Sequence, residues 1–534
     1  QSIKLMAPKN IMKNTHVSQA LDRLQITDNK ATMLIGAFIT ACGGDIAMFS
    51  LSRSSTKRAR ETNRLEISKD ISEKFAENKP QHVAIHWDGK LTEDRLGNRY
   101  EALSIVLSCH PQYSEGKLLG IQKMQNAAGQ TQAETTFNII ESWNIKDAVT
   151  ALVFDTTASN SGWKKGAAKI LEDLLGRKVF YHACRHHVYE LVVKDVWKSL
   201  FGKATTGPEN AWFAHLKRNW SSLDREQQFK TLTIPLCFAE RAAMIVDKFK
   251  LLLNRKDFFT RDDYKQCVTN ALALLGADED IRHHKPGAAH HARWMGTILY
   301  AQKMFMWADQ LDYKSEEVEL LRRFNLFLVL FYIPAWVDSS IGRDAVGNDL
   351  RFVQHMLSYK EYDEQVSTAA SRKLLKHDWY IVEETAVYAL FSPTESKETR
   401  ENMAKALLQV ERTSSFRRGP PSLNATIQIN KDSTLSDLIG PQSWYIFEVF
   451  ECSGDWLRQP VDDWHFSDSF NKMNCYVSSV KVVNDAAERG VKLSTDYAAI
   501  LTDNEQQRDS LLQAVEQHRK IFGDSRKSTL IKGQ

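Results

Sequence analysis

Two aspartates stand at positions where they could hold a metal ion together. Asp88 ends the apolar run 82–87, and Asp155 ends a second apolar run over 148–154. Carboxylates at neighbouring strand ends repel each other unless a cation lies between them, and such oxygen-rich sites suit Mg²⁺ or Mn²⁺. A pair of these ions can activate a water or hydroxyl and stabilise the leaving oxygen in phosphoryl transfer. The alternative is structural, with each aspartate capping the turn or loop that follows its run.

The hydrophobic pattern between residues 82 and 202 predicts the elements that would position these acids. It predicts strands over 82–88, 101–109, 117–123, 148–154 and 178–184, and helices over 132–143, 163–175 and 186–201. Gly176 is expected to cap the helix that precedes it. The order β-β-β-α-β-α-β-α predicts an α/β ribonuclease H-like core, whose first and fourth strands are neighbours at the sheet centre. Asp88 and Asp155 would then lie within metal-bridging distance.

The rest of the chain is predicted to be mostly helical, and we expect four parts. These are a helical N-terminal region with a basic arm (1–80), the first part of the core (81–202), a large α-helical insertion (203–468), and C-terminal helices that complete the core (469–534). The apolar stretch 324–336 is too short to span a bilayer, so we expect a buried helix or strand there and no membrane partner. A polar stretch over 412–422 with two adjacent prolines predicts an exposed loop or linker.

Composition limits the class of protein. The chain has 534 residues, a net charge of +4, 43% hydrophobic and 25% charged residues, which is typical of a globular protein and not of a disordered or fibrous one. Its seven cysteines are dispersed and form no CxxC pair. That pattern argues against a disulfide framework or a cysteine-rich zinc module and favours a reducing compartment, the cytosol or nucleus.

Because the charge is nearly balanced, any nucleic-acid surface must be local. The main candidate is the basic run that contains Arg53, Lys57, Arg58 and Arg60, with Arg64 just after it. Such residues could follow a DNA backbone and make binding salt-dependent. The alternative is an ordinary solvated helix face.

Four short motifs resemble those of the hAT-type DNA transposases. They are FDTTASN at 154–160, CRHH at 184–187, ARW at 292–294 and NDAAERG at 484–490. Together with HWDGK at 86–90, they are also similar to uncharacterised transposon-derived proteins of invertebrate genomes. The resemblance covers roughly residues 80–500. It implies a DDE-type transposase, or a protein derived from one, that acts on DNA in the nucleus.

The resemblance also implies roles for particular residues. Asp88, Asp155 and Glu488 would form the triad that binds Mg²⁺ or Mn²⁺, with Asp485 as the substitute if Glu488 is not the third acid. His187 would lie beside the active site as a further catalytic residue. The alternatives are that His187 is a core histidine and that Glu488 is a surface acid paired with a basic neighbour on its helix.

The insertion would carry a second set of DNA contacts. Arg293 would clamp a phosphate, and Trp294 would stack on an unpaired base, although Trp294 could equally be a core residue. The partners implied are transposon ends and target DNA, with assembly into a homo-oligomer allowed. The chain departs from the family pattern at Ala292, where threonine is usual, and at Gly490, where an apolar or aromatic residue is common. An inactive domesticated DNA- or protein-binding module and a ribonuclease H-like nuclease remain as alternatives.

Overall fold

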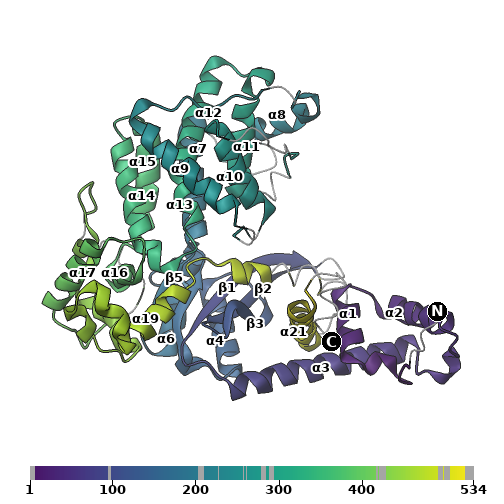
Figure 1. Ribbon diagram of the computed structural model, residues 1–534. Coiled ribbons are helices and arrows are strands. Elements are labelled where there is room, and N and C mark those ends of the chain that lie inside the picture. The colour runs from purple at the N-terminus through teal and green to yellow at the C-terminus, as the bar shows by residue number, and fades with distance from the viewer. Residues whose placement is uncertain are drawn as a thin grey trace. The chain divides into compact units, whose positions relative to one another are not determined.

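The chain folds into two compact units (Figure 1). The computed structural model describes residues 6–93, 98–202, 210–225, 228–255, 258–259, 261–277, 284–287, 294–416, 419, 428–490, 493, 497 and 505–523. Unit 1 comprises Gln1–Tyr181, Arg418–Pro420 and Asn484–Gln534, and unit 2 comprises His182–Arg417 and Pro421–Val483. Unit 2 is therefore inserted into the sequence of unit 1. The division into four parts stays a prediction.

Unit 1 is built on a mixed sheet of five strands, in the order β3-β2-β1-β4-β5. The strands are β1 (Val83–Glu93), β2 (Arg99–Cys109), β3 (Tyr113–Met124), β4 (Val149–Phe154) and β5 (Phe180–Ala183). The first three form an antiparallel meander, and β1 pairs with β4 in parallel. The five predicted strands are present, and the expectation that the first and fourth are neighbours is confirmed. The first strand is predicted to end at Asp88 but continues to Glu93, so Asp88 lies inside β1 and not at its end. The fold class is mixed α/β.

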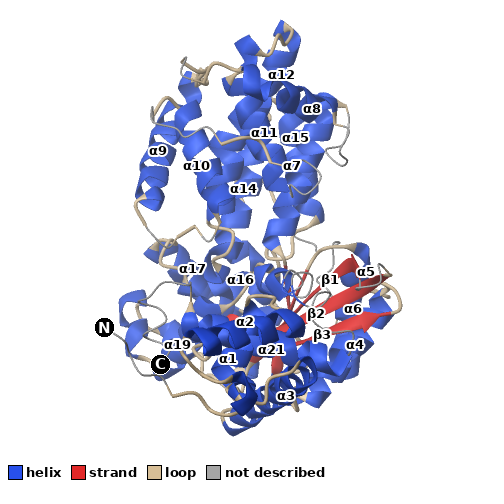
Figure 2. Ribbon diagram, turned by 90° about the vertical axis from the view of Figure 1, so that its right-hand side faces the viewer, coloured by secondary structure: helices blue, strands red, loops and turns tan. Residues whose placement is uncertain are grey.

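Helices cover the sheet of unit 1 (Figure 2). Between the strands lie α4 (Gly129–Ser142), α5 (Ala158–Ser161) and α6 (Ala167–Leu175), and α4 packs against both α6 and β3. Gly176 ends α6 in the left-handed conformation, with φ of 76°, as predicted. The other face of the meander is covered by α21 (Glu505–Phe522), which returns from the C-terminal end of the chain.

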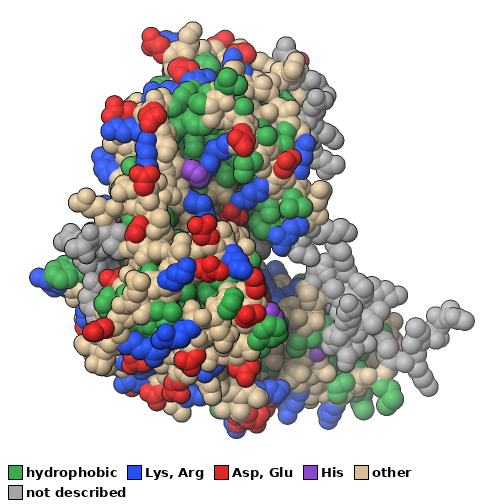
Figure 3. Space-filling model, turned by 60° about the vertical axis from the view of Figure 1, so that its left-hand side comes forward, with side chains coloured by type: hydrophobic (Ala, Val, Ile, Leu, Met, Phe, Trp, Pro, Cys, Tyr) green, Lys and Arg blue, Asp and Glu red, His purple; other side chains and the backbone are tan. Residues whose placement is uncertain are grey.

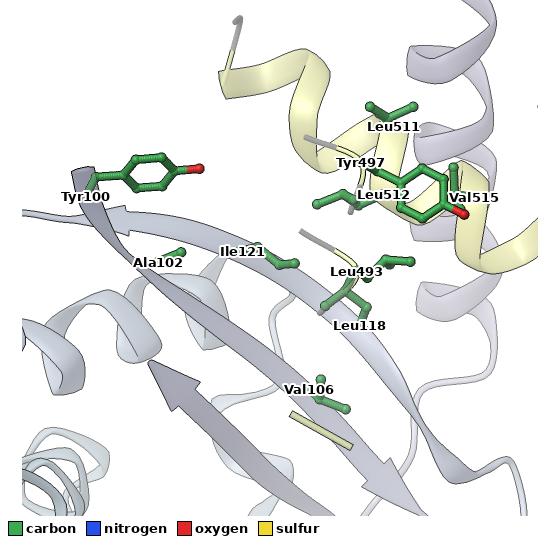
Figure 4. Packing of buried hydrophobic residues seen from close by; sticks show 10 residues of the cluster. All are labelled: Tyr100, Ala102, Val106, Leu118, Ile121, Leu493, Tyr497, Leu511, Leu512 and Val515. Atoms are coloured by element: carbon green, nitrogen blue, oxygen red, sulfur yellow. The ribbon is translucent and has the colours of Figure 1, made fainter. Parts of the chain in front are cut away.

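An apolar cluster joins α21 to the sheet (Figure 4). Leu511, Leu512 and Val515 of α21 pack with side chains of β2 and β3, including Val106 and Leu118. The β2 residues of the cluster alternate along the strand, which is the period-2 pattern of a sheet face covered by a helix. This cluster fixes the C-terminal part of the chain against the sheet.

The N-terminal region of unit 1 is helical, as predicted. It contains α1 (Thr15–Arg23), α2 (Asp28–Ala41) and α3 (Arg53–Glu77). The Asn14 side chain caps α1, and Ser52 begins α3 with a reciprocal capping box to Ser55. The basic run thus lies on the first turns of one long helix, which packs against α1 and α21.

Unit 2 is mostly helical over its described residues, apart from loops and the last two residues of β5, His182 and Ala183. Its helices are α7 (Arg185–Phe201), α8 (Ala211–Asn219), α9 (Ala239–Leu253), α10 (Asp262–Leu274), α11 (Trp294–Met306), α12 (Ser315–Phe327), α13 (Ile333–Val337), α14 (Ala345–Tyr359), α15 (Glu364–Lys376), α16 (Glu383–Ala386), α17 (Lys397–Gln409), α18 (Tyr445–Val449) and α19 (Asp468–Ser479). A π-helical turn over Leu328–Tyr332 joins α12 to α13. By length and composition alone, Ser315–Val337 could cross a membrane, yet 72% of its most apolar window is buried inside the protein. The stretch 324–336 is a buried helix, one of the two forms predicted.

Candidate functional site

The register of β1 and β4 leads towards Asp88 and Asp155. In this parallel pair, the last partners are His86 and Val153. Continued by two residues, the register would set Asp88 beside Asp155. The rings of Trp87 and Phe154, one position before the aspartates, stack with centroids 5.3 Å apart, so the two segments are still adjacent there. Neighbouring strands lie about 4.8 Å apart, and residues in register point to the same face. Both aspartates are half-buried.

Trp87, the residue before Asp88, is held by two asparagines from different motifs. Its indole Nε1–H donates to Asn160 Oδ1 at 3.0 Å, and its carbonyl accepts from Asn484 Nδ2 at 2.8 Å. Asn160 comes from the motif that begins with Asp155, and Asn484 opens the motif that contains Glu488. The three motif segments of unit 1 therefore meet at one tryptophan. The sequence motifs did not predict this arrangement.

The segment that carries Glu488 lies on the same sheet face as Asp88. Residues 485–490 are helical, and the Glu488 amide donates to the Asn484 carbonyl at 3.3 Å. A Cβ added to Gly490 would lie 2.1 Å from Ser104 Oγ. Ser104 is the cross-strand neighbour of Asp88 on β2, so its side chain shares the face of Asp88. Gly490 permits a close approach of helix and sheet, which is the structural reason for glycine at this position.

The other end of this helical turn is also fixed to the sheet. A Cβ added to Gly116 of β3, whose φ is +91°, would lie 3.3 Å from the Ala486 Cβ. With Asn484 bonded to β1, Ala486 beside β3 and Gly490 against β2, the segment 484–490 contacts three strands of the sheet. Glu488 and Asp485, the two candidates for the third acid, are both carried on this segment and are both half-buried.

The chemistry around the aspartates fits a hard cation. Ser104 beside Asp88 and Thr156 after Asp155 have buried hydroxyls with no hydrogen-bond partner among the described residues. Buried hydroxyls are normally satisfied by protein or water. Mg²⁺ takes one or two carboxylates and completes its shell with waters and substrate phosphates. Within the described part of the chain, no group of three His, Cys, Asp or Glu side chains is arranged to hold a metal ion by itself. The metal ligands of the protein that the geometry supports are thus the two aspartate carboxylates.

His187 belongs to unit 2, and its role beside the carboxylates stays a prediction. It lies on the first turn of α7, is half-buried, and its Nδ1 is 3.9 Å from a carboxylate oxygen of Glu190. Burial chiefly lowers the pKa of His377 to about 4, and the charges of Lys373 and His187 lower it further.

The predicted DNA contacts in the insertion are placed only in part. Arg293 lies outside the described residues. Trp294 begins α11, but its side chain also lies outside the described part. Both assignments stay predictions.

The basic run on α3 divides into exposed and buried members. Arg53, Lys57 and Arg58 are exposed and remain candidates for contact with a phosphate backbone. Arg60 is only 1% exposed and forms ion pairs with Asp22 and Asp28. Its predicted role as a DNA contact is wrong in this structure, because its guanidinium is taken up by carboxylates inside the helical region.

Arg64, just beyond that run, is buried in the same way. Its Nε and a terminal nitrogen donate to Asp22 at 2.9 and 2.7 Å. The carboxylate raises the pKa of Arg64 against the opposing effect of burial. On the face seen in Figure 3, lysine and arginine side chains are interspersed with acidic ones, in keeping with the near-neutral charge.

Comparison with known proteins adds nothing to this geometry, since no family model and no curated protein matches the chain. The candidate site is therefore defined by the sheet register, the clamp on Trp87 and the contact between Gly490 and Ser104.

Proposed function

We propose that the chain is a DDE-type DNA transposase, or a recombinase derived from one, built on a ribonuclease H-like core. The observation that carries the proposal is the parallel register of β1 and β4, which, continued by two residues beyond the last paired positions, would place Asp88 in the middle of β1 beside Asp155 just after β4. The strand order 3-2-1-4-5 with a parallel β1–β4 pair supports the fold assignment. The position of residues 485–490 across the same face supports Glu488 as the third acid.

In this proposal the acids position a phosphodiester for attack. Asp88 and Asp155 would hold Mg²⁺ or Mn²⁺, and Glu488 or Asp485 would contribute from the helical turn over 485–490. When bound, the ions lower the pKa of a water or 3′-hydroxyl and neutralise charge on the phosphate. Trp87, through Asn160 and Asn484, keeps the backbone of Asp88 fixed relative to both other segments. The reaction would be hydrolysis at a transposon end, followed by transfer of the freed 3′-hydroxyl to target DNA.

The test is metal-dependent cleavage of supercoiled plasmid and end-labelled duplex DNA by the full chain. Asp155→Asn and Asp88→Asn should each lower cleavage by at least about 10²-fold, the usual loss when one electrostatic group is removed from a transition state. Asp147→Asn is the matched control, because Asp147 is exposed and lies just before β4, at the opposite end of that strand. Cleavage that survives both substitutions, or that needs no divalent cation, would reject the proposal.

A second function is favoured by one observation, the lack of a self-sufficient group of three metal ligands in the described residues. In that case the chain would be a DNA- or protein-binding module that keeps the fold without the chemistry. Such a module should bind DNA equally well with Mg²⁺ and with EDTA, and Asp155→Asn should leave binding unchanged while no cleavage product forms. A simple nuclease, by contrast, would cut without joining strands.

A further inference from the structure

One tryptophan of unit 1 is exposed where burial is the rule. Trp163 is 71% exposed, whereas the other tryptophans whose side chains the structure describes are buried or half-buried. A large aromatic ring in water loses the free energy that its burial normally provides. Among the described residues of unit 1, the Trp163 ring has one ring contact, with the Lys164 ammonium group of the same loop. An indole held in solvent is therefore available for a partner.

The backbone around Trp163 is held tightly, so its indole is presented from a fixed loop. A Cβ at Gly166 would lie 2.4 Å from the backbone of Gly162, and one at Gly129 would lie 2.4 Å from the Lys165 carbonyl. The Gly166 amide donates to the Gly162 carbonyl at 2.7 Å. These contacts press the turn at 163–165 against the start of α4. Little conformational entropy would be lost when a ligand binds to such a loop.

The aromatic ring and the positive charges on the loop together suit a ligand that carries flat rings and negative charges. Lys164 and Lys165 follow Trp163, and both are exposed. The Lys164 Nζ lies 5.0 Å from the centroid of the Trp163 ring. The whole stretch from Thr156 to Gly166 contains no acidic residue. An aromatic face beside two cations is the combination that binds single-stranded nucleic acid, by base stacking and phosphate contact.

The loop is also tied to the acids. It follows Asp155 directly, and its Asn160 accepts the hydrogen bond from Trp87 next to Asp88. We propose that Trp163, with Lys164 and Lys165, stacks an unpaired DNA base and its phosphates beside the aspartate pair. This assignment deepens the proposed function and rests on it for the location of the chemistry. It gives the site a preference for strand ends or extrahelical bases over intact duplex.

The test measures binding by the full chain in EDTA, so that no cleavage occurs. The probes are a fluorescent oligothymidylate of about 20 nucleotides, longer than the site of one binding domain, and a blunt duplex of equal length. Trp163→Ala should weaken binding to the single strand about tenfold, within the range for loss of one stacked base. Trp163→Phe should recover most of that affinity, and duplex binding should change by less than about twofold. Lys164→Gln and Lys165→Gln should each reduce the salt dependence of binding.

Phe466→Ala is the control, because Phe466 is also an exposed aromatic, at 76%, but lies in unit 2. Its affinity for both probes should equal that of the unsubstituted chain. Unchanged single-strand binding by Trp163→Ala would overturn the proposal, and so would an equal loss for both probes. A change in self-association or protein binding with oligonucleotide affinity intact would assign the loop to a protein partner and overturn it as well. Since cleavage is measured separately with Asp155→Asn, none of these outcomes decides the proposed function.

Discussion

Replacing Gly490 by alanine should lift the segment that carries Glu488 away from the sheet. The new Cβ would lie 2.1 Å from Ser104 Oγ and 3.2 Å from Ser104 Cβ. Ordinary van der Waals contact begins at 3.4 Å, so the Ser104 hydroxyl or the helix must move by about 1.3 Å along that line. Ser104 is fully buried, which leaves its hydroxyl little room to rotate away.

The size of the effect follows from two opposing contributions. Overpacking of this kind costs about 1–3 kcal/mol, while alanine in place of a helical glycine returns up to about 1 kcal/mol. A net destabilisation of about 1–2 kcal/mol is expected. A shift of about 1 Å in a group that positions a substrate typically lowers turnover about 10²-fold. Metal-dependent cleavage should therefore fall far more than stability does.

A second substitution tests the cause. Ser104→Ala removes the atom that collides, and by itself it should be neutral, because the Ser104 hydroxyl has no hydrogen-bond partner among the described residues. In the double variant the nearest remaining contact is the 3.2 Å approach to Cβ, which needs a shift of only a few tenths of an ångström. The double-mutant cycle should show a favourable coupling of about 1–2 kcal/mol and a recovery of most of the cleavage.

The assays are urea unfolding and cleavage of supercoiled plasmid. Gly36→Ala is the matched control, since Gly36 also lies in a helix of unit 1 but its added Cβ would meet Leu51 at an ordinary 3.6 Å. That variant should be as stable as the unsubstituted chain or slightly more stable. The reasoning fails if Gly490→Ala unfolds at the same urea concentration as the unsubstituted chain, or if Ser104→Ala does not restore what Gly490→Ala removes.

Two further outcomes are expected for stability. Asp22→Ala leaves the buried guanidiniums of Arg60 and Arg64 without their shared carboxylate, and it should lower the free energy of unfolding in urea by about 3–5 kcal/mol. Asp28→Ala removes a side chain that is 26% exposed and should lower it much less. Equal losses for the two variants would contradict the proposed importance of the shared carboxylate. Burial lowers the pKa of His182 from 6.5 to about 3, so the unfolded chain takes up a proton first and stability should fall as pH drops from about 6.5 towards 3. His182→Gln should make that fall shallower, and an unchanged pH profile would exclude the histidine as a cause.

The sequence predicted the sheet well because the signal for it is local. The run 148–154 is apolar except for Thr150 and lies between polar turns, and it forms β4 with a shift of one residue at its start. Gly176 was recognisable as a helix end from its place after an amphipathic stretch. The neighbouring positions of the first and fourth strands followed from the order of elements, whereas the pairing of Asp88 and Asp155 stays a prediction.

The basic run did not show which of its residues are exposed, because the partners of the buried ones are distant in sequence. Arg60 and Asp22 are separated by 38 residues, and no local pattern shows that they meet. A cluster of positive charge looks the same in the sequence whether it faces water or a buried carboxylate. Arg58, two residues before Arg60, points to solvent on the same helix, so the helical period decides which arginine is available. The same limit applied to Trp163, whose exposure depends on how Gly129 and Gly166 place the loop.

The two hydrogen bonds of Trp87 with Asn160 and Asn484 couple three segments of the site that belong to different motifs. The indole is bonded to Asn160 and the carbonyl to Asn484, so the side chain and the backbone of one residue are fixed from two directions. Any movement of the segment before Glu488 must pull on the peptide that links Trp87 to Asp88. Any movement of the loop after Asp155 must pull on the indole of the same residue. Because the three segments are coupled through Trp87, its two hydrogen bonds and its ring stack with Phe154 add to the sheet register in holding the segments that carry the acids.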